Sequence, residues 1–185
     1  MNKGIFYTKK VVLIALFGAL LSTLKLLLSF LPNIEIITLL IVAFTYVFGI
    51  ALSMGATLVF CLLEILIWGF NPSWLISYLL HWPTVVMVSF LLKKSKINRP
   101  VFIAITLSVI TALFGMQSTF IYMLTGGGIK ANFFDRFIAL YLSGIKFYIV
   151  HIASCFVSIL FGFKPFIQML TKLGKMYLPK TNIEK

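Results

Sequence analysis

Six long apolar runs follow one another along this chain, and only short connections separate them. Hydrophobic residues make up 61% of the 185 residues and charged residues 11%, whereas about a quarter of a typical soluble domain is charged. A water-soluble fold of this length has too little polar surface to cover so many apolar side chains, but a bilayer accepts them. We therefore expect an all-α integral membrane protein built as a six-transmembrane-helix bundle.

The runs are about as long as helical membrane spans, which need roughly 20 residues. We expect spans at 11–31, 36–50, 51–69, 74–92, 101–124 and 137–163. The junction between the second and third spans carries no charge, and we expect a short turn there in which Gly49 and Gly55 supply flexibility. Because spans and connections use the whole length, residues 1–185 are expected to form a single transmembrane domain.

Cations are concentrated in three of the connecting segments. The N-terminal segment, the segment after the fourth span and the C-terminal tail hold twelve of the sixteen Lys and Arg residues, while the opposite side holds Lys130 and Arg136. Cytoplasmic loops carry such an excess, so the bias predicts a multi-pass protein of the cell membrane with both termini in the cytoplasm. The cations lie between apolar runs with little other polar surface, so the net charge of +12 does not indicate nucleic-acid binding.

Five ionisable side chains lie inside the expected spans, where charge is costly and functional roles are common. They are Lys25, Glu64, His81, Lys146 and His151. At about 1.5 Å per residue, all except His151 lie in the outer half of the membrane or near its middle under the expected topology. These five are the first candidates for a binding site.

Helical spacing places polar or aromatic side chains on one face of several spans. The faces are Glu35, Thr38, Thr45 and Gly49 in the second span, Ser53, Thr57, Cys61, Glu64 and Trp68 in the third, Trp74, Tyr78 and His81 in the fourth, and Ser143, Phe147, His151, Ser154 and Ser158 in the last. Such faces point into a bundle rather than at lipid, and together they predict an outward-facing polar pocket. In the fifth span Gln117 faces away from Ser118, and either face fits the pocket.

Each ionisable candidate also has an explanation that needs no ligand. Lys25 can extend along its own stem to the outer interface, and Lys146 lies about a quarter turn away from the polar face of the last span. The Glu64 side chain is too short to reach water, so the explanation that needs no ligand is pairing of its carboxylate with Lys25 or His81. His81 and His151 are also explained as hydrogen-bonded interior histidines, and the nearby aromatic residues as an interfacial belt.

Small residues form one face of the first span. Ala15, Ala19, Ser22 and Ser29 share this face, and Gly18 lies beside it. Faces with small residues four apart let two helices approach closely. The pattern predicts either packing inside the bundle or a docking face for a partner helix.

Common catalytic and cofactor motifs are absent from the sequence. The chain has no GxxxxGK[ST] phosphate loop, no HExxH pair, no GxSxG nucleophile and no cluster of metal ligands. The spans hold a single carboxylate, so paired acids for hydrolysis are also missing. We expect no catalytic residue, no metal, no cofactor and no enzyme activity, and we expect Cys61 and Cys155 to be apolar packing residues.

Two stretches resemble one uncharacterised branch of the substrate-binding S components of energy-coupling factor (ECF) vitamin transporters. Residues 31–38, LPNIEIIT, resemble the PNxExxT entry to the second helix in that branch. Residues 143–151, SGIKFYIVH, followed by FKP at 163–165, resemble its last helix. The chain length, the six-span layout and the spacing of Ala15 and Ala19 are similar as well.

The chain departs from that branch on the last span. Lys146 and Tyr148 stand where the branch tends to have Pro and Asp, and Ser154 and Cys155 stand where it has Gly and Asn. These changes fall on the expected pocket helix, so the resemblance implies no particular substrate.

The resemblance implies the substrate-capture subunit of an ECF-type ABC importer in a bacterial cell membrane. Such a subunit binds a vitamin or related micronutrient on the outer side. It then docks on a separate transmembrane coupling (T) component that carries two ATPases, and topples in the membrane to release the solute. The residues expected to form the docking face are Ala15, Gly18, Ala19 and Ser22.

The polar faces and the resemblance together predict ten substrate-binding residues. They are Asn33, Glu35, Glu64, Trp68, Trp74, Tyr78, His81, Gln117, Lys146 and His151. A non-transport membrane scaffold with a similar layout is the alternative, and a scaffold does not need Glu64, His81 and Lys146 in one cavity. A small membrane enzyme is a third hypothesis, which the missing motifs disfavour.

Overall fold

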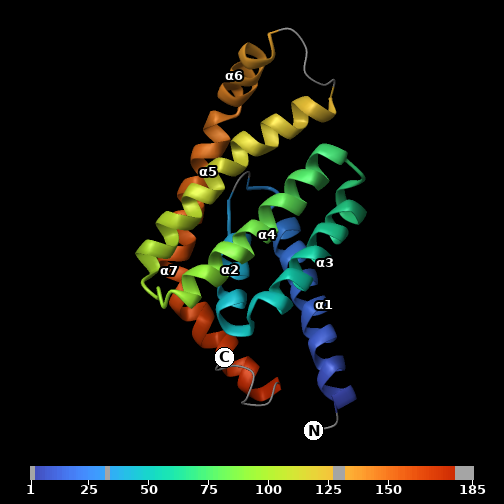
Figure 1. The fold of residues 1–185 in the computed structure, drawn as a ribbon, viewed down its shortest axis with the longest axis vertical. Helices are drawn as coiled ribbons and strands as arrows, with labels where there is room; N and C mark the ends of the chain where they lie inside the picture. Colours follow the sequence, from blue (N-terminus) through green and yellow to red (C-terminus); the bar gives the residue numbers. More distant parts are fainter. Residues whose placement is uncertain (1–2, 32–33, 127–131, 178–185) are drawn as a thin grey trace.

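The computed structural model describes residues 3–31, 34–126 and 132–177, and this part of the chain contains seven helices and no strand. The helices are α1 (Lys3–Leu27), α2 (Ile37–Phe48), α3 (Ile50–Trp68), α4 (Pro72–Lys94), α5 (Pro100–Thr125), α6 (Phe133–Ser143) and α7 (Ile145–Tyr177). Figure 1 shows them as an elongated bundle in which the helices run roughly along its long axis.

Five of these helices are long and apolar enough to cross a membrane, namely α1, α3, α4, α5 and α7. The apolar helix α2 has 12 residues and is about 18 Å long, which is shorter than the roughly 30 Å hydrocarbon layer. Its residues from Ile37 to Val47 are all buried, whereas large apolar side chains are exposed on the five long helices. This arrangement is consistent with a helical membrane bundle, in which lipid covers the exposed apolar side chains.

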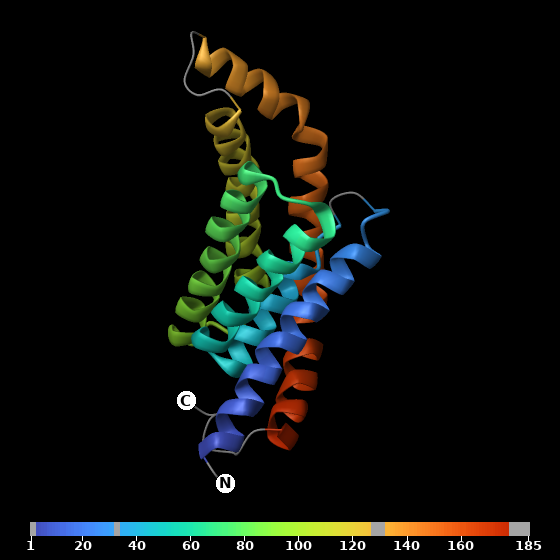
Figure 2. The same cartoon turned by 90° about the vertical axis from the view of Figure 1, so that its right-hand side faces the viewer.

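The short helix α2 lies inside the bundle. It packs chiefly against α7 and α4, while α1 packs against α3, α3 against α4, α4 against α5, and α5 against α7. In Figures 1 and 2, α1 begins and α7 ends at one end of the bundle, and α6 lies at the other. The start of α1 contacts the end of α7, where the Lys9 ammonium donates a hydrogen bond to the Tyr177 carbonyl at 3.0 Å.

A single residue separates α2 from α3. Gly49 has φ 83° and ψ 174°, a conformation that side-chain-bearing residues avoid, and its N–H donates to the Thr45 carbonyl. The short turn expected at this junction is therefore present. Gly55 takes no part in it, contrary to the expectation, because Gly55 lies within α3 and packs against Ile14 of α1.

The last apolar run is divided, unlike the single span expected at 137–163. Helix α6 ends at Ser143, and α7 starts at Ile145 after an interruption at Gly144. The Tyr148 ring packs so closely on Gly144 that a Cβ there would lie 2.9 Å from the ring hydroxyl. At its other end α7 continues to Tyr177, so the part of the basic tail that carries Lys164, Lys172 and Lys175 is helical.

Candidate functional site

A cavity of about 340 Å³ lies where α1 and α3 end and α4 begins, away from the ends of the chain. Five aromatic rings and four polar or charged side chains contribute to its wall. The rings are those of Trp68, Trp74, Tyr78, Trp82 and Phe114, and the polar groups are those of Lys25, Ser29, Glu35 and His151. Small-molecule pockets in proteins combine an apolar wall with a few polar groups in this way, and have volumes of about 300–1,000 Å³.

Half of the ten predicted substrate-binding residues line this cavity: Glu35, Trp68, Trp74, Tyr78 and His151. They come from the segment before α2 and from α3, α4 and α7. Helical spacing therefore identified residues that tertiary packing brings together. Asn33 lies outside the residues that the structure describes.

The Lys25 ammonium and the Glu64 carboxylate form an ion pair at the edge of the cavity. Lys25 is in the last turn of α1, and Glu64 is on α3, the helix against which α1 packs. Of the two partners foreseen for Glu64, the structure selects Lys25. The carboxylate is buried, and its Oε1 atom has no hydrogen-bond partner among the described residues.

Two aromatic rings also face the Lys25 ammonium. Its Nζ atom lies 4.5 Å from the centroid of the Trp74 ring and 4.7 Å from that of Tyr78. Both distances are within the range of cation–π attraction, which is worth about 0.5–1 kcal/mol at exposed sites and more where water is excluded. The ammonium is therefore held by a carboxylate and aromatic rings, and it lines the cavity whereas Glu64 does not.

Glu35 connects the start of α2 to α7. Its Oε1 atom accepts a hydrogen bond from the Thr38 backbone N–H at 2.6 Å, which satisfies one of the free amides at the start of α2. Its Oε2 atom lies 3.4 Å from Nε2 of His151, and its own N–H donates to the Ser154 hydroxyl at 2.7 Å. Two of the predicted residues, Glu35 and His151, thus form a second pair of acid and base beside the cavity.

His81 lies behind the cavity wall rather than in it. Its ring is buried, with centroid distances of 4.4 Å to the Phe114 ring and 4.7 Å to the Trp82 ring. Both of these rings line the cavity, and Nε2 of His81 has no hydrogen-bond partner among the described residues. His81 therefore supports the aromatic wall from the inner side.

Gln117 and Lys146 lie outside the cavity as well. The Gln117 amide donates to the Ser77 carbonyl at 3.0 Å and so ties α5 to α4. The Lys146 side chain is exposed in the first turn of α7. Consequently Glu64, His81 and Lys146, which the transport hypothesis expects to share a cavity, each have different surroundings.

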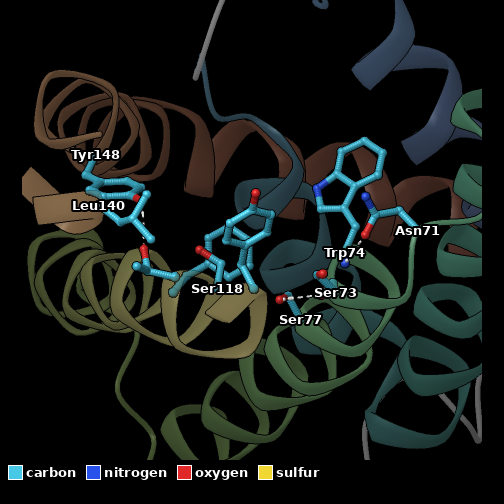
Figure 3. A pocket seen from close by; sticks show the side chains of 10 residues that line it. Asn71, Ser73, Trp74, Ser77, Ser118, Leu140 and Tyr148 are labelled. Carbon is cyan, nitrogen blue, oxygen red and sulfur yellow. Dashed lines mark hydrogen bonds between the residues drawn. The ribbon is translucent and has the colours of Figure 1, made fainter. Parts of the chain in front are cut away.

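A second hollow of about 480 Å³ lies between α4, α5 and the α6–α7 junction (Figure 3). Trp74 and Phe114 line both this hollow and the first cavity, so their rings form part of the partition between the two. Ser118 lines this hollow, whereas its neighbour Gln117 does not, and neither of them lines the first cavity. Tyr148 closes one side, where its hydroxyl lies 3.1 Å from that of Thr119.

The predicted docking residues divide between two faces of α1. Gly18 and Ser22 are buried, and a Cβ at Gly18 would lie 2.6 Å from Val59 of α3. Ala15 and Ala19 are exposed. Packing within the bundle therefore uses Gly18 and Ser22, and a docking surface on this helix would be formed by Ala15 and Ala19.

Sequence reasoning left four of the aromatic or polar wall residues of the cavity out of the ten predicted ones: Lys25, Ser29, Trp82 and Phe114. Lys25 was among the five ionisable candidates but not among the ten predicted residues, because its partner depends on which helix packs beside α1. Phe114 carried no signal among the 19 Phe residues of the chain, and Ser29 was placed on the small-residue face of the first span rather than in the pocket.

Comparisons with protein-family models, with curated proteins and with solved structures find no match for this chain. The fold and the site themselves define the class: a helical bundle of the membrane type with an aromatic-walled cavity between its helices.

Proposed function

We propose that this chain is the substrate-capture (S) component of an ECF-type importer for a vitamin or related micronutrient. The observation that carries the proposal is the 340 Å³ cavity, whose aromatic walls and two acid–base pairs suit a small planar molecule with polar substituents. The residues proposed to contact the ligand are those that line the cavity, Lys25 and Phe114 included.

The proposal includes six membrane crossings with both chain termini in the cytoplasm. The helices alternate in direction along the bundle, with α2 as a short second crossing and α6 followed by α7 as the last (Figures 1 and 2). The cation-rich segment after α4 lies at the same end of the bundle as the start of α1 and the end of α7, as the charge bias of cytoplasmic segments requires. The cavity then opens toward the outer side of a bacterial cell membrane.

The proposed partners are a transmembrane coupling component and its two ATPases. The exposed Ala15 and Ala19, one turn apart on α1, allow close approach of a partner helix. We expect Ala15→Trp combined with Ala19→Trp to abolish co-purification with a coupling component while ligand binding persists. Leu62→Trp combined with Leu66→Trp is the matched control, because these exposed leucines have the same spacing on α3. Unchanged co-purification of the alanine variant would refute this docking face.

Ligand binding is tested on the purified protein with a panel of vitamins, nucleobases and cofactor precursors. A ligand at 100 times its Kd stabilises the folded state by about 2.7 kcal/mol, which corresponds to a rise in Tm of roughly 5–10 °C for a chain of this size. Trp74→Ala should remove the rise. Phe70→Ala should preserve it, because Phe70 is exposed and lines neither the cavity nor the hollow.

A non-transport membrane scaffold is the second candidate. The observation in its favour is the separation of Glu64, His81 and Lys146 into three different surroundings. If no compound raises the Tm, and mass spectrometry of the purified protein finds no bound small molecule, the transport proposal fails and the scaffold is favoured. Turnover of a compound by the isolated protein would contradict both.

A further inference from the structure

A groove of about 640 Å³ lies at the end of the bundle opposite the aromatic cavity, between the end of α2, the α4–α5 connection and the second half of α7. Four lysines line it: Lys93, Lys96, Lys164 and Lys175. Asn98 and Gln168 add neutral polar groups. The acidic residues that the structure describes are Glu35, Glu64 and Asp135, and none of them lines this groove.

The groove is built by tertiary contacts and is more than a group of surface lysines. The Tyr46 hydroxyl donates to the Ile97 carbonyl at 2.8 Å, which holds the α4–α5 connection against the end of α2. The Tyr46 ring in turn packs edge-on against Phe163 of α7, with centroids 5.0 Å apart. These contacts keep lysines from two distant parts of the sequence around one hollow.

The walls of the groove combine cations with apolar surface. Val47, Phe163 and Ile167 line it together with the four lysines. Val157 lies seven residues before Lys164 on α7, on the same helical face and about 10 Å farther toward the middle of the bundle. Val157 is exposed and lines an entirely apolar groove of about 400 Å³ beside α5. A cationic hollow thus adjoins apolar surface of the kind that acyl chains cover.

We infer that this groove binds the phosphate headgroup of an anionic phospholipid, with the acyl chains lying along α7 toward Val157. Four ammonium groups without a carboxylate among the described lining residues attract a negative charge, and Asn98 and Gln168 offer hydrogen bonds to phosphate or glycerol oxygens. Basic pockets between membrane helices bind lipid phosphates on this physical basis. The inference depends on the membrane setting of the bundle and is independent of what the aromatic cavity binds.

The test uses native mass spectrometry of the full chain, released from micelles that contain either phosphatidylglycerol or phosphatidylcholine. We expect retained phosphatidylglycerol adducts and few phosphatidylcholine adducts. Lys96→Gln combined with Lys164→Gln should weaken phosphatidylglycerol binding by about 10- to 30-fold, since each lysine near a lipid phosphate contributes about 1 kcal/mol. Both side chains are exposed, so their replacement does not disturb the core.

The matched control is Lys94→Gln combined with Lys172→Gln. Lys94 ends α4 two residues before Lys96, and Lys172 lies on α7 together with Lys164. Both control lysines are exposed and their replacement removes the same charge, but neither lines the groove. Equal weakening by the two double variants would show diffuse surface attraction and overturn the inference, as would equal retention of the two lipids. Displacement of the bound lipid by millimolar inorganic phosphate would overturn it as well, because the site would then be one for a free anion. If the double variant fails to fold, Lys96→Gln alone gives the same comparison with Lys94→Gln.

Discussion

The ion pair between Lys25 and Glu64 should contribute to stability in a strongly asymmetric way. Removing the cation by Lys25→Met leaves the Glu64 carboxylate buried at 3% exposure, with one oxygen already lacking a hydrogen-bond partner among the described residues. Breaking a buried pair from one side typically costs about 3–5 kcal/mol. We therefore expect Lys25→Met to lower the free energy of unfolding by about that amount.

Removing the anion should cost less. After Glu64→Gln, the Lys25 ammonium still faces the Trp74 and Tyr78 rings, each worth about 0.5–1 kcal/mol. Its stem is flexible and its side chain is 22% exposed, so the charge can also move toward water. We expect a loss of roughly 1–2 kcal/mol for this variant, since the amide keeps the shape of the carboxyl group.

The double variant Lys25→Met with Glu64→Gln separates the pair from its parts. It removes both charges, so its loss in free energy of unfolding should be close to that of Glu64→Gln and well below the sum of the losses of the two single variants. The resulting coupling energy should therefore equal the loss for Lys25→Met, about 3–5 kcal/mol.

The assay is equilibrium unfolding in mixed detergent micelles, followed by circular dichroism. Lys146→Met is the control, because Lys146 is an exposed lysine in an apolar helix without an ion pair or hydrogen bond to the described residues, and its loss should change stability by less than about 0.5 kcal/mol. Equal losses for the two single variants that add in the double variant would refute the reasoning.

Three further predictions concern the backbone and the packing of the helices. Gly49→Ala should cost about 1–3 kcal/mol in the same assay, because φ 83° with ψ 174° is accessible essentially to glycine alone. Gly18→Ala should cost about 1–3 kcal/mol, because the added methyl group would lie 2.6 Å from Val59 and force α1 away from α3. Glu35→Ala should cost about 0.5–2 kcal/mol through loss of the hydrogen bond from the Thr38 amide, while Glu35→Gln should cost less because its amide oxygen still accepts that bond.

The long helices were predictable from the length of their apolar runs and from the prolines and charged segments that end these runs. The fourth and fifth spans lie within two residues of their expected bounds, because Pro72 and Pro100 can start a helix and a basic segment separates the two. The interruption at Gly144 was not predictable in this way. A lone glycine in an apolar run is compatible with a continuous helix, and the observed break involves the Tyr148 ring that packs against it.

The sequence predicted which residues of the candidate site share a helix face, but not which residues contact one another across helices. Helical spacing placed Trp74, Tyr78 and His81 on one face of α4, where Tyr78 and His81 are buried and Trp74 lines the cavity. It could not show that Phe114 of α5 fills the space in front of His81, or that Glu35 meets His151 from more than a hundred residues away. These contacts depend on which helices become neighbours, and a single sequence holds no direct signal of that choice.

The Lys25–Glu64 ion pair sets a condition on any ligand of the aromatic cavity. The Lys25 ammonium at the cavity wall already has a partner within the protein, the buried Glu64 carboxylate. An anionic ligand drawn to Lys25 must therefore compete with Glu64 and leave this buried carboxylate uncompensated, which is costly where water is scarce. A planar ligand that is neutral overall avoids this cost and still gains contact with the aromatic walls. The arrangement of charges thus favours ligands that the rings recognise by shape and stacking. The Lys25–Glu64 ion pair holds α1 against α3 beside the cavity, and the hydrogen bond from the Glu35 N–H to Ser154 holds the segment before α2 against α7.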